Sequence, residues 1–134
     1  MYNLMKYSSH LYLRTDGTLG RYPLIEIDKE GIIVSVSESN GIAQEIAHTR
    51  FFTGIIVPSF ALPDDNMKLS FQNKADFLNQ INNNIATRAQ QLNQTIEQCS
   101  IAVGNKIELY LISGFDLNTF NGAERVNVQN LICS

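Results

Sequence analysis

The chain has 134 residues, which suffices for one domain but falls well short of the ~250 residues that a (β/α)8 barrel needs. Its apolar fraction of 44% and charged fraction of 17% are those of an ordinary globular protein, and a net charge of −3 supplies no basic field for nucleic acid or acidic membranes. The sequence begins without a basic head and apolar run, and no apolar run approaches the ~20 residues of a membrane span. We therefore expect one cytoplasmic domain, without nucleic-acid or membrane partners.

The first part of the chain is predicted to consist of β-strands. Residues 5–13 carry β-favouring bulk, and a polar loop at residues 15–18 ends that strand. Residues 24–28 alternate apolar with acidic side chains, which is the period of a half-buried strand. A tight turn at residues 28–31 leads into a second strand over residues 32–37, so these two strands are predicted to form a hairpin.

A more apolar strand is predicted from Phe51 to Val57. This run is rich in β-branched and aromatic residues and stops at Pro58, which suits a strand that is covered on both faces. The preceding segment, Ile42 to His48, is either a short helical turn or irregular.

The middle of the chain is predicted to be helical. Asn73 can cap a helix, and Asp76 three residues later is favourable near the positive end of the helix dipole. No glycine or proline follows until Gly104, so one helix is predicted from about Lys74 to Ser100.

This helix carries one apolar stripe opposite a face rich in asparagine and glutamine. Two packing arrangements remain open. The stripe can pack on the sheet of its own chain, or it can pair with the helix of a second copy. The amide-rich face is read as a solvated surface. The stripe, which is also the candidate interface, consists of Leu78, Ile81, Ile85, Ala89, Leu92, Ile96 and Cys99.

The end of the chain returns to β-structure. Strands are predicted over residues 106–112 and 125–132. Residues 113–114 end the first of them, and residues 115–122 form a long connection.

The stretch from Arg50 to Ser70 resembles a motif of metal-dependent amidohydrolases of the cytosine-deaminase and chlorohydrolase type. In that family a Gly-hydrophobic-hydrophobic-Val-Pro-Gly-Phe strand leads into Asn-Ala-His-Cys-His-Leu-Glu-Leu-Ser, whose two histidines bind the catalytic metal. Asp64 and Asn66 stand in place of the histidines here, and Lys68 stands in place of the glutamate. The matching positions are Gly54, Val57, Pro58, Phe60, Leu69 and Ser70.

Both ends of the chain extend this resemblance. Residues 5–60 resemble the strands that form a β-sandwich beside the barrel in that family, and residues 104–132 resemble the ending that returns to complete it. The resemblance implies a mainly β, α+β fold in which the N-terminal sandwich strands (residues 1–62) are joined by C-terminal strands (residues 104–134). A loop and long helix (residues 63–103) would replace the catalytic barrel, all within one domain.

The residues needed for metal chemistry are sparse. His10 and His48 lie at no ligand position of the family motif and are read as surface or strand-end residues, while Asp64, Asp65 and Asn66 supply too few oxygens for a dedicated cation site. Cys99 and Cys133 lack metal-ligand spacing and are read as free thiols rather than a disulfide. We therefore predict no catalytic residue, metal or cofactor.

These observations favour a non-catalytic relative of the amidohydrolases that serves as a binding, assembly or regulatory module. Its expected partner is a second copy of the chain or a hydrolase. The alternative is residual metal-dependent hydrolase activity, either alone or as a subunit of a larger enzyme. A third possibility is a remnant that still folds.

Overall fold

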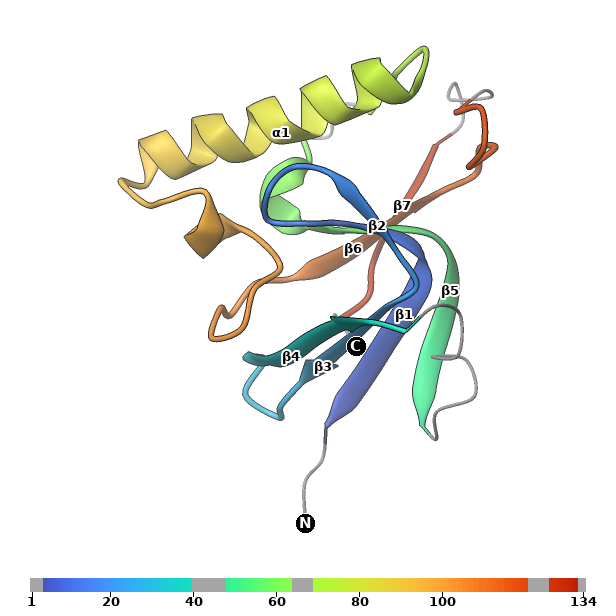
Figure 1. Cartoon of the computed structure of the whole chain (residues 1–134). Helices are drawn as coiled ribbons and strands as arrows, with labels where there is room; N and C mark the ends of the chain where they lie inside the picture. Colours follow the sequence, from blue (N-terminus) through green and yellow to red (C-terminus); the bar gives the residue numbers. More distant parts are fainter. Residues whose placement is uncertain (1–3, 40–47, 64–68, 121–125, 133–134) are drawn as a thin grey trace.

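The computed structural model describes residues 4–39, 48–63, 69–120 and 126–132. They form a mixed seven-stranded sheet with one α-helix beside it, so the expectation of a mainly β chain with a helix is confirmed (Figure 1). Among the described residues, no helix combines the length and the apolarity that crossing a bilayer requires. The elements are β1 (Met5–Leu13), β2 (Leu19–Arg21), β3 (Pro23–Ile27), β4 (Ile33–Glu38), β5 (Thr49–Pro58), η2 (Ser59–Ala61), α1 (Lys74–Gln91), η3 (Glu97–Cys99), β6 (Leu109–Ser113) and β7 (Asn127–Asn130).

The N- and C-terminal strands belong to one sheet. Its order is β4-β3-β1-β5-β6-β7, with β2 paired to the far half of β1. β1 and β5 run parallel, and all other pairs are antiparallel. β5 therefore lies between the first strand and the strands from the end of the chain. The predicted hairpin is confirmed as β3 and β4, and Gly31 takes a φ of 86° in its turn.

The sheet curls until its first edge meets the segment that precedes β6. Ile32 forms an isolated bridge with Lys106, the Ile33 amide donates to the Asn105 carbonyl at 2.9 Å, and the Gly104 amide donates to the Ile33 carbonyl at 2.8 Å. This closure protects an edge that would otherwise be open to other strands. The curled interior buries a cluster that includes Ile25, Ile56 and Leu109.

The opposite face of the sheet packs on α1, which lies across one end of the sheet (Figure 1). Phe77, Ile81 and Ile85 of α1 are buried in one cluster with Ile55 and Val57 of β5. Because Ile55 and Val57 face the helix while Ile56 faces the curled interior, the second half of β5 is covered on both faces, as predicted. The first half is not, since Phe51 and Phe52 are only half-buried and Thr53 is exposed. The helix thus covers its own sheet.

The prediction that the helix continues to Ser100 is wrong, because α1 ends at Gln91. Asn93 takes a left-handed φ of 55°, its amide donates to the Gln90 carbonyl at 3.2 Å, and the Gln94 amide donates to the Ala89 carbonyl at 2.8 Å. These two bonds make a Schellman motif, in which asparagine takes the place usually filled by glycine.

The predicted apolar stripe holds only within α1. Ile81, Ile85 and Ala89 are buried there and Leu78 is partly buried, whereas Leu92 and Ile96 lie beyond the helix and are 52% and 50% exposed. Cys99 is buried again in η3 and is a free thiol. Phe77, which the predicted stripe did not include, is fully buried.

The amide-rich face of α1 is only partly a solvated surface, contrary to the prediction. Asn84 donates to the Ala61 carbonyl at 2.9 Å, and Gln80 donates to the Ser70 carbonyl. Asn82, also on α1, donates to the Gly17 carbonyl at 3.0 Å. These hydrogen bonds hold the segments around Gly17, Ala61 and Ser70 against the helix.

The other strands depart from prediction in small ways. β2 lies just after the predicted loop and was missed. β6 and β7 are shorter than expected. Val128 is 45% exposed, although the alternating side chains around it are typical of a half-buried strand. Residues 42–47 and Cys133 lie outside the described residues.

The middle of β5 contains a bulge. Between the pairs Ser9↔Phe52 and Leu11↔Ile55, β5 advances by one residue more than β1. Gly54 lies in this extra step with a φ of 143°, and a Cβ there would come within 2.5 Å of the Ile112 carbonyl oxygen. The bulge therefore requires glycine.

Candidate ligand-binding site

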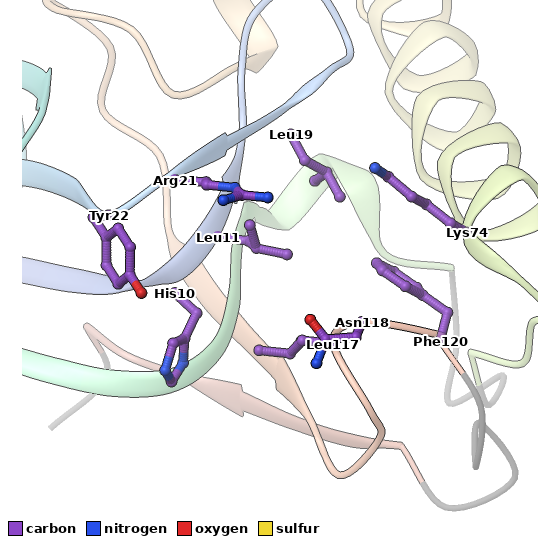
Figure 2. A pocket seen from close by; sticks show the side chains of 9 residues that line it. All are labelled: His10, Leu11, Leu19, Arg21, Tyr22, Lys74, Leu117, Asn118 and Phe120. Atoms are coloured by element: carbon purple, nitrogen blue, oxygen red, sulfur yellow. The ribbon is translucent and has the colours of Figure 1, made fainter. Parts of the chain in front are cut away.

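A cavity of about 300 Å³ lies where β1 and β2 meet the start of α1 and the loop that follows β6 (Figure 2). Three stretches that are far apart in the sequence contribute to it, and the first of them supplies both β1 and β2. Its lining residues are His10, Leu11, Leu19, Arg21, Tyr22, Lys74, Leu117, Asn118 and Phe120.

His10 contributes a buried polar atom. Its imidazole packs edge-on against Phe51, with ring centroids 5.2 Å apart, and lies 6.1 Å from the ring of Tyr22. Its Nδ1 is buried and has no hydrogen-bond partner in the part of the chain that the structure describes. The expectation that His10 is a surface or strand-end residue is wrong, because it lies inside β1, opposite the bulge. His48 is exposed at the start of β5, as expected.

Two aromatic lining residues have unusual backbones. Tyr22 and Phe120 have φ values of 50° and 59°, a left-handed conformation that aromatic residues seldom adopt. Tyr22 is held there by its amide, which donates to the His10 carbonyl, and by its own carbonyl, which accepts from the Ser39 amide. The Phe120 amide donates to the Asp116 carbonyl at 2.6 Å. Such conformations cluster at binding sites.

Arg21 and Lys74 supply positive charge from opposite sides of the cavity. Figure 2 shows the two side chains extending toward each other from β2 and from the first turn of α1. Within the described residues neither one has an ion pair, and the cavity lining contains no carboxylate. The site therefore holds two cations over a floor of apolar side chains.

A neighbouring charged cluster is internally satisfied. Arg14 Nε and Nη2 bind the two oxygens of Glu38 at 2.8 and 2.9 Å, and the Tyr12 hydroxyl donates to Glu38 at 2.8 Å. The bond from Arg14 is the main reason that the pKa of Glu38 is lowered. Burial, followed by the bond to Glu38, raises the pKa of Tyr12 to about 12. This cluster links β1 to β4 and leaves no group for a ligand.

None of the predicted site residues is among the described residues that line this cavity. Asp64, Asn66 and Lys68, the altered metal-motif positions, lie outside the described residues. Among the residues that are described, no three histidine, cysteine or acidic side chains gather as a metal site. Apart from His10, no sequence signal points to the cavity, because its lining residues share no regular spacing.

Comparison with models of protein families, with curated proteins and with solved structures found no match for this chain. Two cations without an ion pair in the described part of the chain, an imidazole, a phenol and a carboxamide beside apolar side chains are suited to holding a small molecule. Among the lining residues that the structure describes, no nucleophile has an adjacent base.

Proposed function

We propose that this chain is a non-catalytic binding module related to metal-dependent amidohydrolases, and that it binds a small molecule at the cavity around His10. The observation that carries the proposal is a cavity with an apolar lining at which two cations, Arg21 and Lys74, have no ion pair among the described residues. A ligand with an apolar body and a polar group suits such a lining, because the body would cover the apolar side chains while the polar group meets the cations.

The relationship to amidohydrolases is supported by the arrangement of the strands. In this proposal the curled sheet corresponds to the composite β-sandwich of that architecture, with β6 and β7 completing what β1 to β5 begin. The joining of both chain ends in one sheet, and the cover that α1 provides on its face, are what this relationship requires. The barrel would have been replaced by α1 and its flanking loops.

The assembly role is part of the same proposal. The turn after α1 exposes Leu92 and Ile96 at 52% and 50%, and a second copy or a hydrolase subunit would cover them. Light-scattering mass at several concentrations measures self-association. A monomer at all concentrations that also fails to bind a co-expressed hydrolase would refute this part.

Ligand binding can be located with the two histidines of the chain. Protein labelled with ¹⁵N only at histidine gives signals from His10 in the cavity and from His48 on the surface, so His48 serves as an internal control. A screen of a chemically mixed small-molecule library should yield compounds that shift the His10 signals and leave those of His48 unchanged. If no compound in the library does so, the proposed function is wrong.

The hydrolase alternative is tested by metal analysis of the purified protein. Stoichiometric zinc or iron that is lost in Asp64→Ala or Asn66→Ala would overturn the non-catalytic assignment. The proposal expects the same metal content in these variants as in the unaltered chain.

A further inference from the structure

The charge of the described cavity lining has one sign although the chain as a whole is acidic. The chain carries a net charge of −3, yet the lining residues that the structure describes include Arg21 and Lys74 and no acidic side chain. The acidic residues closest to the lining in sequence are engaged locally. Asp76 accepts from the Gln72 amide at 3.0 Å, and Asp116 accepts from the Asn118 amide at 2.8 Å. Neither aspartate lines the cavity.

The two cations have complementary geometry for an anion. A guanidinium presents a planar fork that matches two oxygens of a carboxylate or phosphate, whereas an ammonium acts as a compact point charge. Because Arg21 comes from β2 and Lys74 from α1, an anion between them would be contacted from two separate elements (Figure 2).

The rest of the lining specifies a compact apolar body. Leu11, Leu19, Leu117 and Phe120 supply aliphatic and aromatic surface beside the charged groups. A volume of about 300 Å³ lies at the lower end of small-molecule sites, so there is space for about one ring. His10 also lines the cavity, but its Nδ1 is buried, so the imidazole is assigned as a reporter beside the ligand and not as its hydrogen-bond partner.

We infer that the cavity binds a small organic anion, with its carboxylate or phosphate between Arg21 and Lys74 and an apolar, single-ring body against the leucines and Phe120. This inference rests on the proposed binding function and adds the class of ligand. Carboxylates and phosphate monoesters share the required chemistry, so the experiment has to distinguish them.

Three probes of one shape separate charge from apolar contact: benzoate, phenyl phosphate and neutral benzamide. Each is titrated into the full chain labelled with ¹⁵N at histidine, and the His10 and His48 signals are followed. Benzoate or phenyl phosphate should shift His10 with an affinity about tenfold or more above that of benzamide, which is the scale of one charge-assisted hydrogen bond. The tighter of the two anions identifies the source. Raising the salt concentration should weaken both anions and leave benzamide unchanged.

Charge-removing variants then test the assigned residues. Arg21→Gln and Lys74→Gln should each weaken the tighter anion by about tenfold, while Lys29→Gln, which removes an exposed lysine from the turn between β3 and β4, should not. Both lining residues are exposed, so these variants should fold normally, and the His48 signals report this.

The inference is overturned if benzamide binds as tightly as the anions, or if Arg21→Gln and Lys74→Gln have no more effect than Lys29→Gln. It is also overturned if none of the three probes shifts His10. In any of these cases the library screen decides the broader binding function separately, because neutral compounds that shift His10 would leave that function standing.

Discussion

Replacing Gly54 by alanine is the most direct test of how the sheet positions the site. At a φ of 143° an L-residue is strained by about 1–3 kcal/mol. The added Cβ would also lie 2.5 Å from the Ile112 carbonyl oxygen and 3.1 Å from Leu111 and Ser113 side-chain atoms, and such overpacking costs about 1–3 kcal/mol. Alanine also lowers the entropy of the unfolded chain, which offsets about 0.4–1 kcal/mol of this loss. We therefore expect a net loss of about 3 kcal/mol in the free energy of unfolding.

Gly104 provides a matched control. It also has a positive φ, 94°, but a Cβ there would meet no atom within 4 Å. Gly104→Ala should therefore lose only about 1 kcal/mol, from backbone strain partly offset by the unfolded-state effect. Urea denaturation measures both variants, and the difference of about 2 kcal/mol isolates the close approach to β6. Equal losses in the two variants would refute the reasoning. Because the bulge lies opposite His10, Gly54→Ala should also shift the His10 imidazole signals.

Three further predictions concern the helix and the charged cluster. Asn73→Ala removes the cap that accepts from the Asp76 amide at 2.8 Å and should lower the free energy of unfolding by about 1 kcal/mol. Asn79→Ala, at an exposed position of the same helix, should be neutral or slightly stabilising. Equal stabilities of the two variants in urea denaturation would contradict this prediction. Ile85→Ala should cost about 2–5 kcal/mol and Leu92→Ala about 0.5 kcal/mol or less, and a large loss at Leu92 would mean that it is buried in solution. The pKa of Glu38 is lowered in the folded state. The contribution of this carboxylate to stability is therefore present above the ordinary pKa of 4.5 and is lost as the pH falls through the folded pKa. Glu38→Gln should remove that part of the pH dependence of the urea midpoint, and an unchanged profile would contradict it.

The strands could be predicted where local chemistry and burial agree. The hairpin of β3 and β4 follows from alternating side chains and a turn that needs Gly31, and β5 follows from an apolar run that ends at Pro58. The helix start at Asn73 was equally readable, because capping is a local interaction.

The end of the helix was not predicted because Asn93 replaces the expected glycine. Asparagine enters the left-handed region more readily than other residues with side chains, and the Schellman bonds stabilise it there. A second signal was present in the sequence. Thr95 and Gln98 form a reciprocal capping box, with bonds of 2.8 and 3.1 Å, that begins a new turn before η3.

The cavity could not be predicted because its geometry arises only from tertiary structure. His10 and Arg21 come together because β2 folds back along the far half of β1, and a three-residue strand leaves almost no periodic signal. Lys74 joins them only because α1 packs on this end of the sheet. Sequence patterns predict single helices and strands, whereas this site forms only when β1, β2, α1 and the loop after β6 pack together.

The structure also explains why the positions that match the hydrolase motif carry little evidence of chemistry. Gly54 has no room for a Cβ, Val57 is fully buried between α1 and the sheet, and Leu69 is 6% exposed within the same core. A strand that has to pack in this way needs these residues whether or not a metal was ever bound nearby. The matches therefore bear on packing. At the cavity beside β1, by contrast, Arg21 and Lys74 have no ion pair in the described part of the chain, and a carboxylate or phosphate is the group that our proposal places between them.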